Sequence, residues 1–388
     1  MMEVLLVLIV LAPGMLLIAE LVLSLIGNTS SQTNDIADEN KDNRKLAIIM
    51  PAHNEDSVVI NSVQSIYAQL AVGDILVVVA DNCTDATAEV VRSLNLDNVV
   101  VLERTDLVNR GKGFALDYGH QHLKQKDEYY DLIGIIDADC QFANDDAVKK
   151  IKHKSRYADL FQVSYLMKSN ANTSLLSSFA WYIKTASRSI GMSKLFGACH
   201  IQGSGFFISA NVSGSVNFAS GSIVEDLELG LNMAENRVFC QYLPSVALIS
   251  EMPSDVDVLR TQKSRWEVGH LKVLFEESFP RALRSIRSYN LRYFLLVCDL
   301  SIPPLVTYFG FLFLIFFVLS ILGNAGSIFI FIYLLSISYL IYFHWKRFCL
   351  YFHVDFSFIQ LVAYIKIKIK VIKNYSSKKS RVWNKTKR

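Results

Sequence analysis

Charged residues are scarce in this sequence. Only 19% of the 388 residues are Asp, Glu, Lys or Arg, whereas 52% are hydrophobic. Soluble domains usually carry about a quarter charged residues, so this composition favours a membrane protein. The six cysteines lack metal-ligand spacing, which is the pattern of reduced cytosolic thiols, and no internal repeat is present.

Three apolar segments are long enough to cross a bilayer, which takes roughly 20 residues. They cover residues 4–26, interrupted only by Glu20, and residues 302–322 and 325–343. Gly323, Asn324 and Gly326 predict a tight turn between the last two. These two segments are therefore expected to form a helical hairpin.

Both ends of the chain lack charge of one sign. The start, MMEV, has no Lys or Arg, so an uncleaved anchor is favoured over a signal peptide. Residues 366–388 have no Asp or Glu, and the positive-inside tendency places this tail in the cytoplasm. Crossing back over the hairpin puts the middle of the chain there too. We expect a multi-pass protein of the cell membrane. The net charge of +3 lies mostly in the tail and gives no reason to expect nucleic-acid binding.

The sequence then divides into five parts. Residues 1–27 form the N-terminal transmembrane anchor and residues 28–44 a polar linker. Residues 45–290 form a cytoplasmic domain, and residues 291–345 the transmembrane hairpin. Residues 346–388 form a basic membrane-surface segment and tail.

Within the cytoplasmic domain, apolar runs alternate with amphipathic stretches. Strands are expected at 45–52, 74–80, 98–104 and 131–137, and helices at 56–70, 84–94, from 113, and at 144–156. This alternation predicts an α/β fold with a mostly parallel sheet. Ligands on such sheets bind at the carboxyl ends of the strands. The polar clusters PAHNE, ADNCTD and DADC all follow predicted strands.

The DADC cluster raises an electrostatic question. Asp137 and Asp139 are one residue apart at the end of an apolar strand, where like charges repel. A cation between them would resolve this, and hard carboxylate oxygens suit Mg²⁺ or Mn²⁺. Two carboxylates leave coordination positions for a diphosphate. The alternative is a solvated strand end, because this short motif also occurs by chance.

Other polar residues fit a nucleotide. Asp81 could accept a hydrogen bond from a pyrimidine N3–H, and Glu55 one from a ribose hydroxyl. Arg110 and Lys112, set among glycines, could contact phosphate. Gly203 and Gly205 would permit close approach of a substrate. Helix capping and ordinary turns remain the alternatives for each of these clusters.

Six motifs stand in one order from residue 45 to residue 270: PAHNE, ADNCTDAT, RGKG, DADC, EDLELG and QKSRW. In this order they resemble the family 2 glycosyltransferases, and the last resembles the Gln-x-x-Arg-Trp signature of that family. The resemblance implies an A-type glycosyltransferase fold with a mostly parallel mixed sheet. It also implies a nucleotide-diphospho-sugar donor and a divalent metal.

The resemblance assigns roles by position. Asp226 would be the general base, with Glu225 beside it, and Asp139 would carry the metal, helped by Asp137. The remaining residues would bind the donor nucleotide (Pro51, Glu55, Asp81, Lys112 and Asp137) or, together with Glu225, lie at the diphosphate and acceptor (Gln262, Arg265, Trp266, Gly203 and Gly205). One carboxylate base is enough for inverting transfer, because a nucleotide diphosphate leaves readily. Without the other motifs, EDLELG would be a charged helix start.

We therefore expect a membrane-bound enzyme that adds one sugar, from a UDP-sugar, to a lipid-linked or saccharide acceptor in polysaccharide or glycolipid assembly. Membrane lipid would be a further partner. A processive polymer synthase is the first alternative, although three membrane segments are few for a channel. A non-catalytic nucleotide-sugar-binding scaffold is the second, and the intact Asp139 and Asp226 disfavour it.

Overall fold

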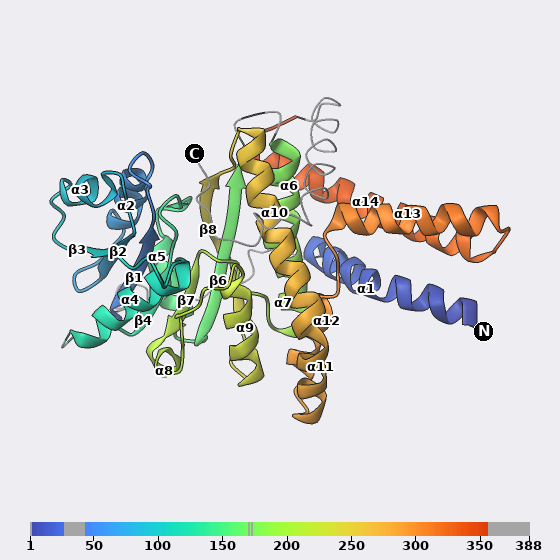
Figure 1. Cartoon of the computed structure of the whole chain (residues 1–388), viewed down its shortest axis with the longest axis horizontal. Coiled ribbons are helices and arrows are strands. Elements are labelled where there is room, and N and C mark those ends of the chain that lie inside the picture. Colours follow the sequence, from blue (N-terminus) through green and yellow to red (C-terminus); the bar gives the residue numbers. More distant parts are fainter. Residues whose placement is uncertain (1, 27–42, 127, 170, 172–173, 356–388) are drawn as a thin grey trace. The chain divides into compact units, whose positions relative to one another are not determined.

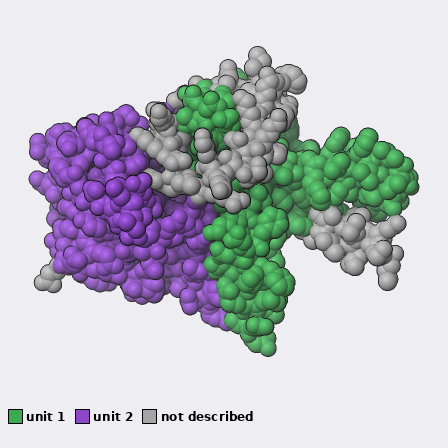
Figure 2. All heavy atoms as spheres, viewed as in Figure 1, with its two compact units in different colours: residues 1–27, 169–198, 253–380 green, residues 28–168, 199–252, 381–388 purple. Residues whose placement is uncertain are grey.

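The computed structural model describes residues 2–26, 43–126, 128–169, 171 and 174–355. The chain divides into two compact units (Figures 1 and 2). Unit 1 comprises residues 1–27, 169–198 and 253–380, and unit 2 comprises residues 28–168, 199–252 and 381–388. Most of the predicted linker, and the predicted tail from residue 356 onward, lie outside the described residues.

Unit 2 is built around a mixed sheet of eight strands in the order β3-β2-β1-β4-β7-β6-β8-β5. The strands are β1 Leu46–Ala52, β2 Ile75–Asp81, β3 Val99–Arg104, β4 Leu132–Ile135, β5 Gln141–Phe142, β6 Leu160–Lys168, β7 Phe206–Ser209 and β8 Gln241–Glu251. Strands β1 to β4 pair in parallel, as do β6 and β8, whereas β7 runs antiparallel to both β4 and β6. The predicted strands and the mostly parallel α/β arrangement are confirmed.

The helices of unit 2 follow the strands in the predicted alternation (Figure 1). They are α2 Val59–Tyr67, α3 Thr87–Arg92, α4 Lys112–Gln125, α5 Ala147–Lys154, α8 Ala210–Ser213 and α9 Glu225–Glu235. Every residue of β2 and β4 is buried, and β1 is buried except for Pro51. Burial on both faces explains why these strands are continuous apolar runs and show no alternation. Their carboxyl ends carry the polar clusters to one edge.

Unit 1 is helical in its described part. Its elements are α1 Met2–Leu25, α6 Leu175–Tyr182, the π-helix η2 Ile183–Ser187, α7 Arg188–Phe196, α10 Val256–Lys272, the π-helix η3 Val273–Glu277, α11 Ser278–Arg287, α12 Leu291–Asp299, α13 Leu305–Ile321 and α14 Gly326–Phe352. Among the described residues, α14 alone is both long and apolar enough to cross a membrane. Shorter apolar helices are formed by Pro13–Leu25 and by α13.

Charged groups hold the end of α1 in place. Glu20, which interrupts the first apolar segment, is buried and accepts a hydrogen bond from Arg188 Nε at 2.8 Å. Arg188 also pairs with Asp299 on α12. At the C-terminus of α1, Lys194 donates to the carbonyl of Leu23, and Arg347 donates to that of Ser24 at 2.7 Å. Cations thus meet the unpaired carbonyls and the negative end of the helix dipole.

Candidate active site

The loops that follow β1 and β2 interlock at the edge of the sheet. Asn54 Oδ1 accepts a hydrogen bond from the Thr84 amide at 2.6 Å, and the Glu55 amide donates to Thr87 Oγ1 at 2.8 Å. Asn54 and Asn82 adopt left-handed backbone conformations, with φ of 58° and 52°. Asparagine tolerates this region because its short side chain can hydrogen-bond locally. PAHNE and ADNCTD therefore form one polar surface.

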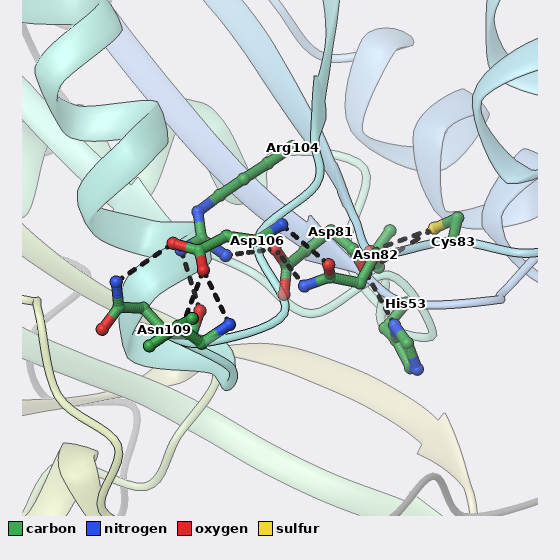
Figure 3. Close-up of polar contacts among 9 residues, drawn as sticks. His53, Asp81, Asn82, Cys83, Arg104, Asp106 and Asn109 are labelled. Atoms are coloured by element: carbon green, nitrogen blue, oxygen red, sulfur yellow. Dashed lines mark hydrogen bonds and ion pairs between the residues drawn. The ribbon is translucent and has the colours of Figure 1, made fainter.

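Asp81 ends β2 and is held by a basic residue from the next strand (Figure 3). Arg104 Nη1 lies 2.6 Å from Asp81 Oδ1, and both side chains are largely buried. The same guanidinium contacts Asp106 Oδ2 at 2.9 Å and the carbonyl of Asn109 at 2.8 Å. His53 Nδ1 lies 2.6 Å from the backbone oxygen of Asp81. Sequence reasoning missed Arg104, although a basic residue at the end of the third strand was a readable signal.

The cation beside Asp137 is a lysine. Lys112, the first residue of α4, places Nζ 2.5 Å from Asp137 Oδ1 and donates to the carbonyl of Gly203 at 2.6 Å. Burial acts to lower the pKa of Lys112, but Asp137 and the two acids that open α9 outweigh it and raise that pKa above its ordinary value. Lys112 therefore stays charged and links Asp137 of DADC to the backbone of Gly203.

Asp137 and Asp139 offer carboxylate oxygens that fit a divalent ion, but two side chains do not complete its coordination. Within the described ranges, no three His, Cys, Asp or Glu side chains are grouped to hold a metal by themselves. Both aspartates are half-buried just beyond the end of β4, and both offer hard oxygen atoms. Such a donor set suits Mg²⁺ or Mn²⁺ when a diphosphate and water complete the coordination.

The loop 202–205 contacts Asp137 of DADC and lies beside Asp226 of EDLELG. Gly203 and Gly205 adopt φ of 84° and 76°, a region that favours glycine. A Cβ at Gly203 would lie 3.3 Å from Asp226 Oδ2, and one at Gly205 would lie 2.7 Å from side chains of the sheet. Ser204 accepts a hydrogen bond from the Asp137 amide at 3.0 Å. The glycines thus allow the loop to approach both Asp226 and Asp137.

Gln162, which sequence reasoning missed, holds this loop from inside the sheet. Its side chain on β6 is fully buried. Nε2 donates to the carbonyls of Ser204 at 2.7 Å and Gly205 at 3.2 Å, and Oε1 accepts from the Gln202 amide at 2.9 Å. A buried amide in an apolar strand must find such partners. A glutamine within the apolar run of β6 was the feature of the sequence that could have revealed it.

Gln162→Leu is expected to lower both stability and catalysis. The change leaves buried backbone groups of the loop without a partner, at about 1–3 kcal/mol for each group. We expect kcat/KM to fall about tenfold or more because Gly203 and Ser204 shift against Lys112 and Asp137. Urea unfolding and steady-state kinetics on the folded fraction measure the two effects separately. Unchanged kcat/KM in a destabilised but folded variant would contradict a role in the site.

Glu225 and Asp226 open α9 beside a cavity of about 230 Å³. The cavity is also lined by Lys112, Gly203 and the loop 217–220. Burial, and then the neighbouring Asp226 carboxylate, raise the pKa of Glu225 to about 8. The Glu225 carboxyl group therefore keeps its proton to higher pH than an exposed glutamate does.

The raised pKa of Glu225 predicts a pH-dependent stability. Between the unfolded value of 4.5 and the folded value of about 8, the folded protein keeps a proton that the unfolded chain has lost. The stability contributed by this group is therefore full below pH 4.5 and is lost as pH rises through about 8. Glu225→Gln should remove this part of the decline. Thermal unfolding of both proteins across this range is the measurement, and parallel curves would contradict the assignment.

The last predicted residues lie in unit 1. Gln262, Arg265 and Trp266 are on α10. The Trp266 ring lies 4.5 Å from that of Trp181 on α6, and Lys184 Nζ lies over the latter ring at 5.4 Å. Trp181, Lys184 and Trp266 line a cavity of about 140 Å³. The cavity also reaches Pro303 and Pro304, which precede α13. An aromatic pair beside an apolar helix suits a ligand with both apolar and polar parts.

Comparison with known proteins identifies the class. The sheet, with polar loops at the carboxyl ends of its strands, is an A-type glycosyltransferase fold. It is similar to the mannosyltransferase PcManGT of Pyrobaculum calidifontis, with a TM-score of 0.56 and 15% identity over 96% of this chain and 97% of that one. Residues 43–269 match the family described as glycosyltransferase like family 2, and the chain belongs to this family. It is a glycosyltransferase.

A curated relative is more similar over a shorter stretch. The 4,4'-diaponeurosporenoate glycosyltransferase of Staphylococcus aureus is 34% identical over 112 residues. These residues make up 29% of this chain and 28% of the relative. The match thus spans little more than a quarter of the length of that relative.

Proposed function

We propose that this enzyme adds a single sugar, with inversion, to a lipid-linked acceptor at the cytoplasmic surface of the cell membrane. The donor is a UDP-sugar, and the product enters polysaccharide or glycolipid assembly. The observation that carries the proposal is that Lys112, Gly203 and Asp226 line one cavity and that Lys112 also pairs with Asp137. The Asp226 carboxylate and the Lys112 ammonium group thus share a cavity lined by Gly203, where a base and a cation are both needed for transfer from a diphosphate.

Each residue has a distinct role in the proposed reaction. Asp226 takes the proton from the acceptor hydroxyl as that oxygen attacks the anomeric carbon. Lys112 lies against the phosphates and balances the charge of the departing diphosphate. Asp81, fixed by Arg104, binds the base, and Glu55 binds the ribose. Asp139 and Asp137 would hold the divalent ion, which neutralises the leaving group when bound. PcManGT, which shares the fold, was solved with GDP-Man and Mn²⁺, which supports a nucleotide-diphospho-sugar donor and a divalent metal but does not favour uridine over guanosine.

Membrane anchoring is supported by the apolar helices of unit 1. Helix α14 has the length to span a bilayer, and α1 and α13 would accompany it. Lys194 and Arg347 gather at the end of α1, as expected for the cytoplasmic side. Side chains exposed on α13 include Phe311, Phe313, Leu314 and Phe317, which suit contact with lipid and offer no polar lining for a sugar channel.

The proposal is tested with membranes that contain the full-length enzyme. A panel of radiolabelled UDP- and GDP-sugars is supplied, and the lipid fraction is extracted. We expect label from one UDP-sugar in a lipid product that is heavier by one sugar, and none with the Asp226→Asn variant. A ladder of products would support the processive alternative. Absence of transfer from every donor, with donor binding intact, would support the non-catalytic scaffold.

A further inference from the structure

Helix α11 has its polarity reversed for a helix in water. The side chains it buries are polar: Ser278, Arg281 and Ser285. The side chains it exposes are large and apolar: Phe279 is 72% exposed, Leu283 40% and Ile286 56%. A helix at the surface of a soluble protein shows the opposite arrangement.

The exposed apolar residues form one continuous face. Phe279, Leu283 and Ile286 follow the spacing i, i+4 and i+7, which places them on one side of the helix. Phe275, one turn before Phe279, is also exposed, and the α11 face is defined as Phe275, Phe279, Leu283 and Ile286. Tyr289, in the turn that follows, and Leu291, which begins α12, are exposed next to it in the chain. Contiguous apolar surface of this kind marks an interaction site.

The buried side of α11 fixes this orientation. Arg281 Nη2 lies 2.7 Å from Glu277 Oε2, and Arg281 Nη1 donates to the Tyr293 hydroxyl of α12 at 3.2 Å. Glu277 lies one turn earlier on the same helical run, so the contact that ties this side of α11 to another helix is the one between Arg281 and the fully buried Tyr293 of α12. Rotating α11 to bury Phe279 would break this contact, so the outward position of the apolar residues is built into unit 1.

The charge near this face is positive. Residues 275–292 carry four arginines and two glutamates, and one glutamate, Glu277, is already paired with Arg281. Arg284, Arg287 and Arg292 are exposed. Long arginine side chains beside apolar residues can reach lipid headgroups while their stems stay on the apolar surface.

The direction of α11 within unit 1 fits a membrane surface. Figure 1 shows α11 running across the direction of α13 and α14. If α14 spans the bilayer, a helix in this direction lies along the membrane plane. Helices with an apolar face and a basic flank bind at the headgroup boundary.

We propose that the α11 face lies in the headgroup region of a membrane that contains anionic lipid, with Arg284 and Arg287 against the lipid phosphates. This inference rests on the proposed membrane anchoring and adds a second contact with the bilayer. The second contact would restrain the tilt of unit 1 relative to the membrane normal, which a spanning helix alone leaves variable.

The test uses the full chain in nanodiscs of phosphatidylcholine mixed with phosphatidylglycerol, whose acyl chains are brominated. A fluorescent amino acid is placed in separate proteins at position 283 on α11, at position 335 on α14 and at position 237 in unit 2. Leu335 is 54% exposed and reports on the spanning helix, and Arg237 is an exposed residue outside the proposed contact. Bromine quenches the probe only when lipid is in contact with it.

We expect quenching at 283 and 335 and none at 237. Arg284→Gln combined with Arg287→Gln should reduce quenching at 283 and leave 335 unchanged, whereas the surface control Arg92→Gln should change neither. Replacing phosphatidylglycerol by phosphatidylcholine should likewise reduce quenching at 283 and leave quenching at 335 unchanged.

Three results would overturn the inference. Quenching at 335 without quenching at 283 would leave the anchoring intact and remove the α11 contact. A blue-shifted probe at 283 that brominated lipid does not quench would mean that a second copy of the chain covers the face. Equal quenching at 283 in charged and uncharged lipid would remove the anionic preference. Absence of quenching at 335 would instead contradict the anchoring itself.

Discussion

Asp226→Asn is expected to lower kcat by roughly 100-fold or more, the usual size of a lost general base. The amide keeps the shape of the side chain and its place beside Gly203, but it cannot take a proton from the acceptor. Donor affinity should be nearly unchanged, because Asp81, Lys112 and Asp139 remain. The measurements are kcat at saturating donor and acceptor, and donor binding by titration calorimetry.

Glu228→Gln is the matched control for this prediction. Glu228 lies in the first turn of the same helix, lines the same cavity and accepts a hydrogen bond from Ser222 Oγ at 2.7 Å. Its loss should reduce kcat far less. If Asp226→Asn abolished donor binding while the rate at saturating donor survived, Asp226 would be a binding residue and the proposed base would be wrong.

Asp139→Asn is expected to abolish transfer, and removal of divalent ions by EDTA should do the same to the unaltered enzyme. An ion that neutralises the leaving diphosphate is worth several kcal/mol in the transition state. A loss of about 4 kcal/mol would correspond to about 1,000-fold in rate. Activity after EDTA, and after return of Mg²⁺ or Mn²⁺, is measured together with binding of Mn²⁺ and donor to the variant.

Asp145→Asn, an exposed acid six residues further along, controls for the change in charge and should retain activity and metal response. Full activity of the unaltered enzyme in EDTA, with no bound metal detected, would contradict the metal site. In that case the Lys112 ammonium group, 2.5 Å from Asp137 Oδ1, would be the cation that balances the charge of DADC.

The sequence by itself determined the class of the protein and the edge of the sheet that carries the site. Strands β1 to β4 were predictable because each is a short apolar run followed by turn residues, a local pattern. The six motifs could be recognised by their order along the sequence, without knowing the distances between them in space. The apolar segments were likewise readable from composition, since length and hydropathy are local properties.

Only the tertiary structure decided which groups meet. The sequence predicted a cation at DADC, and the structure places Lys112 beside Asp137, 25 residues earlier in the chain. Gln162 contacts a loop about 40 residues later, so no local pattern could reveal its role. These pairings depend on how β6, β7 and α4 are brought together.

The reversed polarity of α11 depends on tertiary structure in the same way. Its sequence has an amphipathic period, and a helix of that kind is normally expected to bury its apolar side. The contact of Arg281 with Tyr293 of α12 holds the polar side inward instead. Periodicity gives the faces of a helix, but only the partners on neighbouring helices decide which face is buried.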